Sequence, residues 1–443
     1  MNVLKFGGTS VGSATRMRDV ARIVESHSPV MIVLSAVSGT TNKLVDIAYH
    51  YNEGKKEKAL ALIDELEQSY FPFVEDLLQT ESAQQEGKNI IATHFAHLRD
   101  YARNGFGIKQ YREILAQGEL ISTQLFYRYM VEQNKNVVLI NALDFMRVDE
   151  DGEPEMHFIQ EALHAILAQV PGKQFYITQG FICRNPVGEI ENLKRGGSDY
   201  SASLIGAALG SEEIQIWTDI DGMHNNDPRI VQGTYPVRNL SFDEAAELAY
   251  FGAKILHPSS VNPARKAGIP VRLKNTMQPE AEGTLISEQS ERGTIKAIAA
   301  KDGITAIRIV SNRMLLAFGF LRNVFEIFER YKTPIDMITT SEVAVSLTID
   351  NEGQLENILK ELSVIADVEV DRDLSIISVV GDHISEGPGL AGKIFGALRS
   401  ISMRMVSGGG SPNNVSLLLP TKHKNEALRQ LNVELFQSVS QQC

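Results

Sequence analysis

Apolar and polar positions follow two alternating patterns from the start of the chain to about Ile286. Short apolar runs of strand length are separated by segments in which apolar residues recur every three or four positions. This alternation predicts an open, mainly parallel α/β sheet with helices on both of its faces. The clearest strand-like runs are PVMIVLSAV (29–37), NVVLINAL (136–143), FYITQGFI (175–182), IQIWTDI (214–220) and IPVRLK (269–274).

Between Thr41 and Glu132 the pattern becomes almost wholly helical. The stretch KKEKALALIDELEQSYFPFVEDLL (55–78) places apolar residues at helical spacing over its whole length. We therefore expect a helical elaboration on the sheet.

The pattern changes again after a polar stretch, SEQSERGT (287–294), which we interpret as a domain boundary. Beyond it, the same order of strands and helices occurs twice, starting at ITAIRIVS (304–311) and at LSIISVVGD (374–382). This repeat predicts two ferredoxin-like βαββαβ units, the second of which runs out of chain before its last strand. The strand TIKAIAA (294–300) could fill that place, and the first unit would then be inserted within the second. The expected domains are 1–290, 304–373, and 294–303 plus 374–443.

Composition and charge restrict the function classes. The chain has 43 Lys and Arg against 55 Asp and Glu, a net charge of −12, which argues against a nucleic-acid-binding protein. Cys183 and Cys443 are the only cysteines, too few for a disulfide framework and without metal-ligand spacing. No apolar run reaches the roughly 18 residues that a membrane span needs. We therefore expect a cytoplasmic protein that binds neither nucleic acid nor a membrane.

The stretch KFGGTS (5–10) follows the first apolar run directly. Two glycines let backbone amides approach an anion, and the ammonium of Lys5 adds a charge, so this stretch could hold a phosphate. It is not the GxxxxGK[ST] loop of the common nucleotide-binding fold. A strand followed by two glycines is also an ordinary tight turn, and the residues alone leave both interpretations open.

A second candidate, RGGSDYSASLIGAALG (195–210), places Arg195, two glycines, Ser198 and Asp199 before an alanine-rich helix. Free amides and the positive end of the helix dipole favour an anion at such a place. The simpler interpretation is that Ser198 or Asp199 caps the helix. An arginine with two glycines exceeds what a cap requires.

A third candidate, WTDIDGMHNNDPR (217–229), is an apolar strand that runs into Asp219, Asp221, Asp227 and Arg229. Ligands of α/β sheets bind outside the carboxyl ends of strands, although Asp, Asn, Gly and Pro also form ordinary loops. Weaker candidates, each with an ordinary structural explanation, are Glu119, Lys254 and His257. The stretch GPGLAGK (387–393) fits GxGxxG, but no acid closes the next strand, so we do not predict a dinucleotide site.

Taken in order, several of these motifs resemble those of aspartate kinases, which have an amino acid kinase fold followed by tandem ACT domains. The matching stretches are KFGGTS, LSAVSGTTN, GELIST, GFICRN, RGGSDYSA, TDIDGMHNNDPR, FGAKILHP and IPVRLKNT. The resemblance implies transfer of the γ-phosphoryl group of ATP, with Mg2+, to the β-carboxylate of L-aspartate. The product would be 4-phospho-L-aspartate, on the path to lysine, threonine and methionine. Because no long segment follows the second repeat, we expect a monofunctional kinase without a homoserine dehydrogenase domain.

The resemblance also implies roles for individual residues. Lys5 would neutralise the transferring phosphoryl group, and Asp199 would lie in the same catalytic pocket. The residues implied to bind aspartate are Thr41, Glu119, Arg195 and Ser198, with Arg195 on the α-carboxylate and Glu119 on the ammonium. Those implied to bind the nucleotide are Lys5, Gly7, Gly8, Thr9, Thr218, Asp219, His224, Arg229 and Lys254. His224 departs from the family pattern, in which a tyrosine is common, so the detail of adenine binding stays open.

The repeats resemble ACT domains, which bind amino acids at paired interfaces, and this implies a homodimer. The residues that resemble the effector pocket of lysine-inhibited members are Met314, Phe320, Leu321, Ile335, Asp336, Ser341 and Glu342. Asp336 and Glu342 could accept ammonium groups. Lysine is the expected inhibitor and threonine the alternative, while an acidic turn at a strand end would explain the same residues without a ligand.

Two other functions remain to be compared with this one. A related kinase could phosphorylate glutamate, acetylglutamate or a nucleotide, against which the tandem repeats and RGGSDYSA argue. A catalytically silent amino-acid sensor could keep only the repeats, against which the presence of Lys5, Glu119, Arg195 and Asp199 argues.

Overall fold

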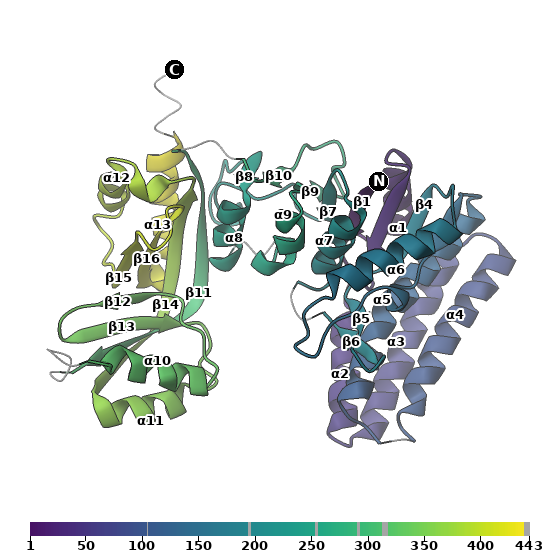
Figure 1. Cartoon of the computed structure of the whole chain (residues 1–443), viewed down its shortest axis with the longest axis horizontal. Coiled ribbons are helices and arrows are strands. Elements are labelled where there is room, and N and C mark those ends of the chain that lie inside the picture. Colours follow the sequence, from purple (N-terminus) through teal and green to yellow (C-terminus); the bar gives the residue numbers. More distant parts are fainter. Residues whose placement is uncertain (104, 194–195, 253–255, 290–292, 312–317, 438–443) are drawn as a thin grey trace. The chain divides into compact units, whose positions relative to one another are not determined.

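The computed structural model describes residues 1–103, 105–193, 196–252, 256–289, 293–311 and 318–437. The chain forms two compact units, Met1–Met223 with Leu256–Glu288, and His224–Ile255 with Gln289–Cys443. Each unit has its own sheet (Figure 1).

The first unit is built on a mainly parallel sheet, as the alternating pattern predicts. Its strand order is β3–β4–β2–β1–β7–β9–β10, and β10 alone among these runs antiparallel to its neighbour. The strands are β1 (Asn2–Phe6), β2 (Val30–Leu34), β3 (Val137–Leu139), β4 (Phe175–Gln179), β7 (Ile214–Thr218), β9 (Val271–Asn275) and β10 (Thr284–Ser287). A separate hairpin consists of β5 (Ile182–Arg184) and β6 (Ile190–Asn192).

Helices pack on both faces of this sheet. The expected helical elaboration is formed by α2 (Thr40–Asn52), α3 (Lys56–Leu77), α4 (Glu81–Asp100) and α5 (Ile108–Glu132), which lie alongside one another (Figure 1). The other helices are α1 (Ala14–Glu25), α6 (Met156–Gln169), α7 (Gly197–Leu209), α9 (Asn262–Lys266), and the short η1 (Ala142–Asp144) and η2 (Pro258–Val261).

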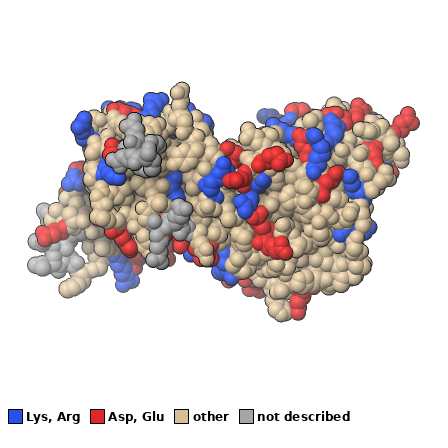
Figure 2. Space-filling model, turned by 90° about the horizontal axis from the view of Figure 1, so that it is seen from above, with Lys and Arg blue, Asp and Glu red and all other residues tan. Residues whose placement is uncertain are grey.

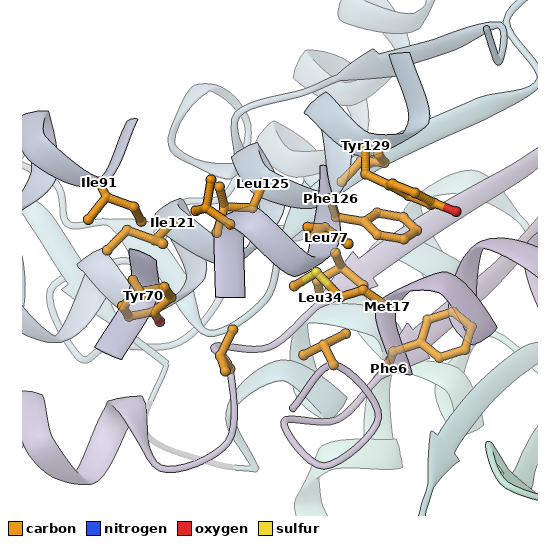
Figure 3. Close-up of a cluster of buried hydrophobic side chains, with 14 of the residues drawn as sticks. Phe6, Met17, Leu34, Tyr70, Leu77, Ile91, Ile121, Leu125, Phe126 and Tyr129 are labelled. Carbon is orange, nitrogen blue, oxygen red and sulfur yellow. The ribbon is translucent and has the colours of Figure 1, made fainter. Parts of the chain in front are cut away.

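Alternation along β1 separates the core from the candidate chemistry. Leu4 and Phe6 belong to the buried cluster that α1, α3, α4 and α5 complete. Figure 3 shows Phe6 and Leu34 from two strands together with Met17 of α1 and the apolar side chains of α5. Because successive side chains of a strand point to opposite faces, Lys5 lies on the other face, toward α7.

The second unit has an antiparallel sheet of order β12–β13–β11–β14–β16–β15. Its strands are β11 (Ile295–Val310), β12 (Ile338–Thr340), β13 (Ala344–Ile349), β14 (Asp367–Gly381), β15 (Met405–Gly408) and β16 (Asn414–Pro420). A further short strand, β8 (Asn239–Ser241), precedes α8. The helices are α8 (Phe242–Tyr250), α10 (Phe320–Arg330), α11 (Leu355–Ile365), α12 (Leu390–Ala397) and α13 (Lys424–Asn432), with short turns η3 (Ile384–Glu386), η4 (Thr421–His423) and η5 (Val433–Gln437).

Two strands of this sheet are longer than the sequence pattern indicates. We expected separate strands at 294–300 and 304–311, whereas β11 is continuous and pairs with β14 along most of its length. The register shifts between Lys301 and Ala306 mark the expected break. Ile295–Lys301 pair with Ile376–Gly381, which is the pairing that insertion of the first repeat within the second requires.

Residues 224–255 precede the boundary that we expected near residue 290. By their contacts, however, they belong to the second unit. Ile230 and Val231 pack in the core that Ile298 and Ile377 form, and the side-chain amide of Asn226 donates to the carbonyl of Leu428 at 3.1 Å. In the sequence, Ile230 and Val231 are only two apolar residues in a loop rich in turn-forming residues. Two residues show no periodicity, so the pattern could not indicate which core they join.

Charged side chains of both signs are interspersed on the face that Figure 2 shows. Within the described ranges, no helix is long and apolar enough to cross a membrane.

Candidate active site

A cavity of about 480 Å³ opens at the carboxyl ends of β1, β2 and β7 in the first unit. Parallel α/β sheets bind ligands at this edge because the loops that follow neighbouring strands converge there. The lining residues are Gly7, Gly8, Thr9, Ser35, Ala36, Val37, Ser38, Gly39, Thr41, Asn42, Glu119, Phe181, Gly197, Ser198, Thr218 and Asp219.

Lys5 and Asp199 form an ion pair beside this cavity. The Lys5 Nζ atom lies 2.6 Å from Asp199 Oδ1, and the two side chains are 11% and 16% exposed. Lys5 is contributed by β1 and Asp199 by the first turn of α7. A Cβ atom on Gly7 would lie 3.5 Å from Lys5 Nζ, so the ammonium lies directly behind the glycine loop that lines the cavity.

The glycine loop is both a turn and a wall of the cavity. The amides of Ser10 and Val11 donate to the carbonyl of Gly7, at 2.9 and 3.3 Å, which closes the turn. A Cβ atom on Gly8 would lie 3.0 Å from the carbonyl oxygen of Ala36, tighter than nine in ten real Cβ contacts, so a side chain at Gly8 would push these two loops slightly apart. The two interpretations of KFGGTS are therefore compatible.

Glu119 presents an unfilled acceptor among the cavity-lining residues. Its Oε1 accepts from the amide of Ala36 at 3.1 Å, whereas Oε2 is buried and has no hydrogen-bond partner among the described residues. Burial raises the pKa of this carboxyl to about 8, against the opposing effects of the Ala36 amide and of the Lys5 charge. A cationic group bound beside Oε2 would supply the missing partner and favour the ionised form.

Ser198 is held close to the end of β4. Ser35 Oγ donates to Ser198 Oγ at 2.9 Å. A Cβ atom on Gly180 would lie 2.4 Å from Ser198 Cβ, so position 180 must be glycine for the backbone to lie this close to Ser198.

Phe181, the next residue, has a φ of 67°, which is uncommon for an aromatic residue. The amide of Ile182 donates to the carbonyl of Gly180 at 2.7 Å across this residue, which makes a γ-turn of the rare positive-φ kind. Ser201 Oγ accepts from the Phe181 amide at 2.8 Å and holds the turn. Such local strain is found mainly at functional sites, and here it lies at the cavity wall.

The structure brings most of the candidate residues of the first unit together. Gly7, Gly8, Thr9, Thr41, Glu119, Ser198, Thr218 and Asp219 line the one cavity, and Lys5 and Asp199 adjoin it. Arg195, Lys254 and Met314 lie outside the described residues. His224 and Arg229 belong to the second unit, where the guanidinium of Arg229 donates to Asp227 through Nε and Nη2, at 3.0 and 2.7 Å.

Sequence reasoning missed several lining residues. Ser35, Ala36, Val37, Ser38 and Gly39 follow β2, and their position after a buried strand was a usable signal. Gly197 stood within a stretch that was singled out. Asn42 and Phe181 likewise stood within quoted motifs, LSAVSGTTN and GFICRN, but the first was interpreted as a helix residue and the second as part of a strand.

The effector candidates lie in the first repeat of the second unit. Phe320 and Leu321 begin α10, Ile335 and Asp336 precede β12, and Ser341 and Glu342 follow it. Ser341 accepts through Oγ from the amide of Ala344 at 3.1 Å, which makes a turn, and Glu342 is exposed.

Asp336 is already engaged within the chain. Its Oδ1 lies 2.9 Å from Lys301 Nζ and accepts from the Tyr250 hydroxyl at 2.8 Å, and the side chain is only 2% exposed. Lys301 Nζ also lies 2.8 Å from Asp350 Oδ2 and 4.7 Å from the centre of the Tyr250 ring. Asp336 therefore ties the end of α8 to the sheet of the second unit.

No set of three or more His, Cys, Asp or Glu side chains that could hold a metal ion occurs in the part of the chain that the structure describes. The acidic side chains at the cavity are Glu119, Asp219 and the adjoining Asp199.

Comparison with known proteins gives matches over nearly the whole chain. Residues 1–275 match the amino acid kinase family, and residues 377–435 match an ACT domain. The chain is 33% identical to the lysine-sensitive aspartokinase 3 of Escherichia coli, over 98% of this chain and 99% of that protein. It is 34% identical to the chloroplastic aspartokinase 3 of Arabidopsis thaliana, over 98% of this chain and 82% of that protein.

Solved structures agree. Aspartokinase III of E. coli in complex with aspartate and ADP superposes with a TM-score of 0.84 at 33% identity, covering 98% of this chain and 100% of that one. The same enzyme in complex with lysine and aspartate gives 0.82, covering 98% and 99%. The expected fold class, an amino acid kinase fold followed by ferredoxin-like ACT domains, is confirmed.

Proposed function

The chain belongs to the aspartokinase family, and on this premise we propose that it transfers the γ-phosphoryl group of ATP to the β-carboxylate of L-aspartate, giving 4-phospho-L-aspartate. The observation that carries the proposal is the convergence of one cation, one buried carboxyl with a free acceptor and one glycine loop on a single cavity. The complex of the E. coli relative with aspartate and ADP supports both substrates.

The chemistry requires alignment and charge neutralisation rather than a strong base. The β-carboxylate of aspartate is ionised at pH 7, so it can attack the γ-phosphorus without losing a proton. A bond forms between a carboxylate oxygen and phosphorus, and the bond to the ADP oxygen breaks. Lys5 supplies positive charge where the two anions approach, and Asp199 holds its ammonium in place.

Substrate orientation is assigned to groups of the same cavity. Glu119 Oε2 would accept from the ammonium group of aspartate, and the hydroxyls of Thr41 and Ser198 would donate to its carboxylates. Arg195 is assigned to the α-carboxylate on the resemblance alone. The loop amides at Gly7, Gly8 and Thr9 would face the phosphates of the nucleotide.

The remaining residues that we propose to bind the nucleotide are Thr218, Asp219, His224, Arg229 and Lys254. Thr218 and Asp219 line the cavity. His224, Arg229 and Lys254 are assigned on the resemblance alone, and an imidazole at position 224 can pack on a purine as a phenol does.

Mg2+ fits this site only as an ion carried mainly by the nucleotide. The described residues offer no cluster of three His, Cys, Asp or Glu side chains. Asp219, which lines the cavity, and Asp199, which adjoins it, are the carboxylates that could contact the ion. When bound, the ion would neutralise phosphate oxygens and help ADP to leave.

We further propose that lysine inhibits the enzyme through the first ACT repeat of a homodimer. The lysine complex of the E. coli relative supports the effector. Leu321, Phe325, Ile338 and Val343 leave an apolar surface exposed on that repeat, and β12 is an edge strand, as suits pairing with a second copy. Threonine is the alternative effector.

The domain division, the pathway and the location complete the proposal. The catalytic domain would span 1–290, although residues 224–255 belong by their contacts to the second compact unit. The first ACT domain would span 304–373, and the second ACT domain 294–303 plus 374–443. The pairing of Ile295–Lys301 with β14 supports the last of these. The enzyme would act in the cytoplasm, at the first step toward lysine, threonine and methionine.

The test is trapping of the acyl phosphate as a hydroxamate with a panel of acceptors. ATP-dependent hydroxamate should form with L-aspartate and only weakly with L-glutamate or acetylglutamate. Preference for glutamate would overturn the substrate assignment, and no turnover with any acceptor would favour a silent sensor.

A further inference from the structure

A pair of buried hydroxyls joins two loops behind the cavity. Ser10 Oγ lies 2.6 Å from Thr276 Oγ1, although 266 positions separate the two residues. Ser10 is fully buried and Thr276 is 3% exposed, and neither lines the cavity.

The end of β7 lies between these two loops. The carbonyl of Trp217 accepts from the amide of Gly7 at 3.1 Å and from Ser10 Oγ at 3.3 Å. The next carbonyl, that of Thr218, accepts from the amide of Thr276 at 2.8 Å. The loops after β1 and β9 are thus both tied to the last two peptide groups of β7, which lies between those strands in the sheet.

The number of hydroxyl hydrogens decides which group donates in each of these hydrogen bonds. A hydroxyl has a single hydrogen to donate. The arrangement that satisfies every contact has Ser10 donating to the Trp217 carbonyl and Thr276 donating to Ser10. Loss of the Ser10 hydroxyl therefore breaks two contacts, whereas loss of the Thr276 hydroxyl breaks one.

The tie connects two parts of the cavity wall. Gly7 and Gly8 follow β1, Thr218 ends β7, and all three line the cavity, while Ser10 and Thr276 stand behind them. We propose that Ser10 and Thr276 are positioning residues that fix the phosphate-binding loop at Gly7 and Gly8 against the nucleotide loop at Thr218. This inference rests on the proposed function only in that these two loops receive the nucleotide.

The expected consequence is selective for the nucleotide. A buried hydrogen bond whose loss leaves a partner unsatisfied is worth enough to change an equilibrium several-fold to a hundred-fold. Ser10→Ala should raise both the KM for ATP and the Kd for ADP about tenfold. The KM for aspartate should stay within about twofold, because the Glu119 and Ser198 side of the cavity is held by other contacts.

The experiment compares five variants with the wild-type chain by steady-state kinetics, by calorimetric ADP binding and by thermal unfolding. Thr276→Val should raise the Kd for ADP less than Ser10→Ala does. Thr276→Ser keeps the hydroxyl, so its Kd for ADP should lie within about twofold of the wild-type value. The double variant of Ser10→Ala and Thr276→Val should be no worse than Ser10→Ala alone, because their effects belong to one contact. Ser203→Ala is the matched control, since Ser203 is fully buried and its Oγ has no partner among the described residues.

Three outcomes would overturn the inference. They are unchanged ADP affinity in Ser10→Ala, an equal rise in the KM for both substrates, and the same loss in Ser203→Ala. If Ser10→Ala does not fold, the comparison of Thr276→Val with Thr276→Ser decides alone. ADP binding by the wild-type chain needs no turnover, so a failure to phosphorylate aspartate would refute the proposed function and leave this test intact.

Discussion

Lys5 Nζ lies 2.6 Å from Asp199 Oδ1, which joins the first strand of the chain to the first turn of a helix almost two hundred residues later. The ion pair places the Lys5 ammonium behind the glycine loop. Because the Asp199 carboxylate belongs to the chain itself, the ammonium is held there before any substrate binds. We predict that Lys5→Met lowers the turnover of aspartate phosphorylation roughly a hundred-fold or more, because the charge at the transferring group is lost.

Steady-state kinetics and thermal unfolding together check this prediction. Lys5→Arg keeps the charge but not its position, and it should recover only part of the rate. Turnover of Lys5→Met close to that of the wild-type chain, in a folded variant, would contradict the proposed role.

We predict that the Glu119 carboxyl releases a proton when aspartate binds. Burial raises the pKa of its carboxyl to about 8, and the ammonium of aspartate favours the ionised form. At pH 7 the free enzyme therefore carries this proton in most molecules, and binding should release a large part of one proton per site, as calorimetry in buffers of different ionisation enthalpy measures.

The same group predicts how stability depends on pH in the absence of ligand. Its pKa is higher in the folded state than the ordinary 4.5, so the folded state binds more protons between the two values. The free energy of unfolding should therefore fall as pH rises from about 4.5 to about 8, and Glu119→Gln should remove that contribution. Equal proton release by the wild-type chain and Glu119→Gln would refute the first statement, and an equal dependence of their unfolding free energies on pH would refute the second.

Gly180 should tolerate no side chain. A Cβ atom there would lie 2.4 Å from Ser198 Cβ, so Gly180→Ala must displace Ser198 or the turn at Phe181. We expect Gly180→Ala to lower the unfolding free energy by about 1 to 3 kcal/mol and to raise the KM for aspartate. Gly105→Ala, where nothing lies within 4 Å of the added atom, is the control, and a similar loss in both would remove the steric explanation.

Two acidic residues of the first repeat should behave differently. Glu342 is exposed, so Glu342→Ala should weaken lysine inhibition and leave uninhibited turnover and stability largely unchanged. Asp336 accepts from Tyr250 and pairs with Lys301, so Asp336→Ala should also lower the unfolding free energy, by about 1 to 3 kcal/mol. Inhibition curves of Glu342→Ala that coincide with those of the wild-type chain would exclude that residue from the effector site.

The sequence predicted elements and loop positions better than it predicted contacts. Alternating apolar runs indicated the parallel sheet, and the stretches that end two of its strands indicated Lys5 and Asp219 as candidate site residues, whereas Thr218 was expected from the resemblance alone. The Phe181 turn left no pattern, because its strain depends on Ser201 and Gly180 in three dimensions.

Two further features follow from pairing across long sequence distances. The continuity of β11 through Lys301 arises from its pairing with β14. The partner of Asp336, Lys301, lies in a different strand, so an acid that reads as an open ligand in the sequence is an internal ion pair in the fold.

The most direct test uses L-aspartate labelled with 18O in its β-carboxylate. After ATP-dependent turnover, hydroxylamine attacks the carbonyl carbon of the acyl phosphate, and the released phosphate keeps the former carboxylate oxygen. The account predicts one 18O atom in the released phosphate, measured by mass spectrometry or by the isotope shift in 31P NMR. Phosphate without 18O, formed by a chain that consumes ATP in the presence of aspartate, would contradict attack by the carboxylate.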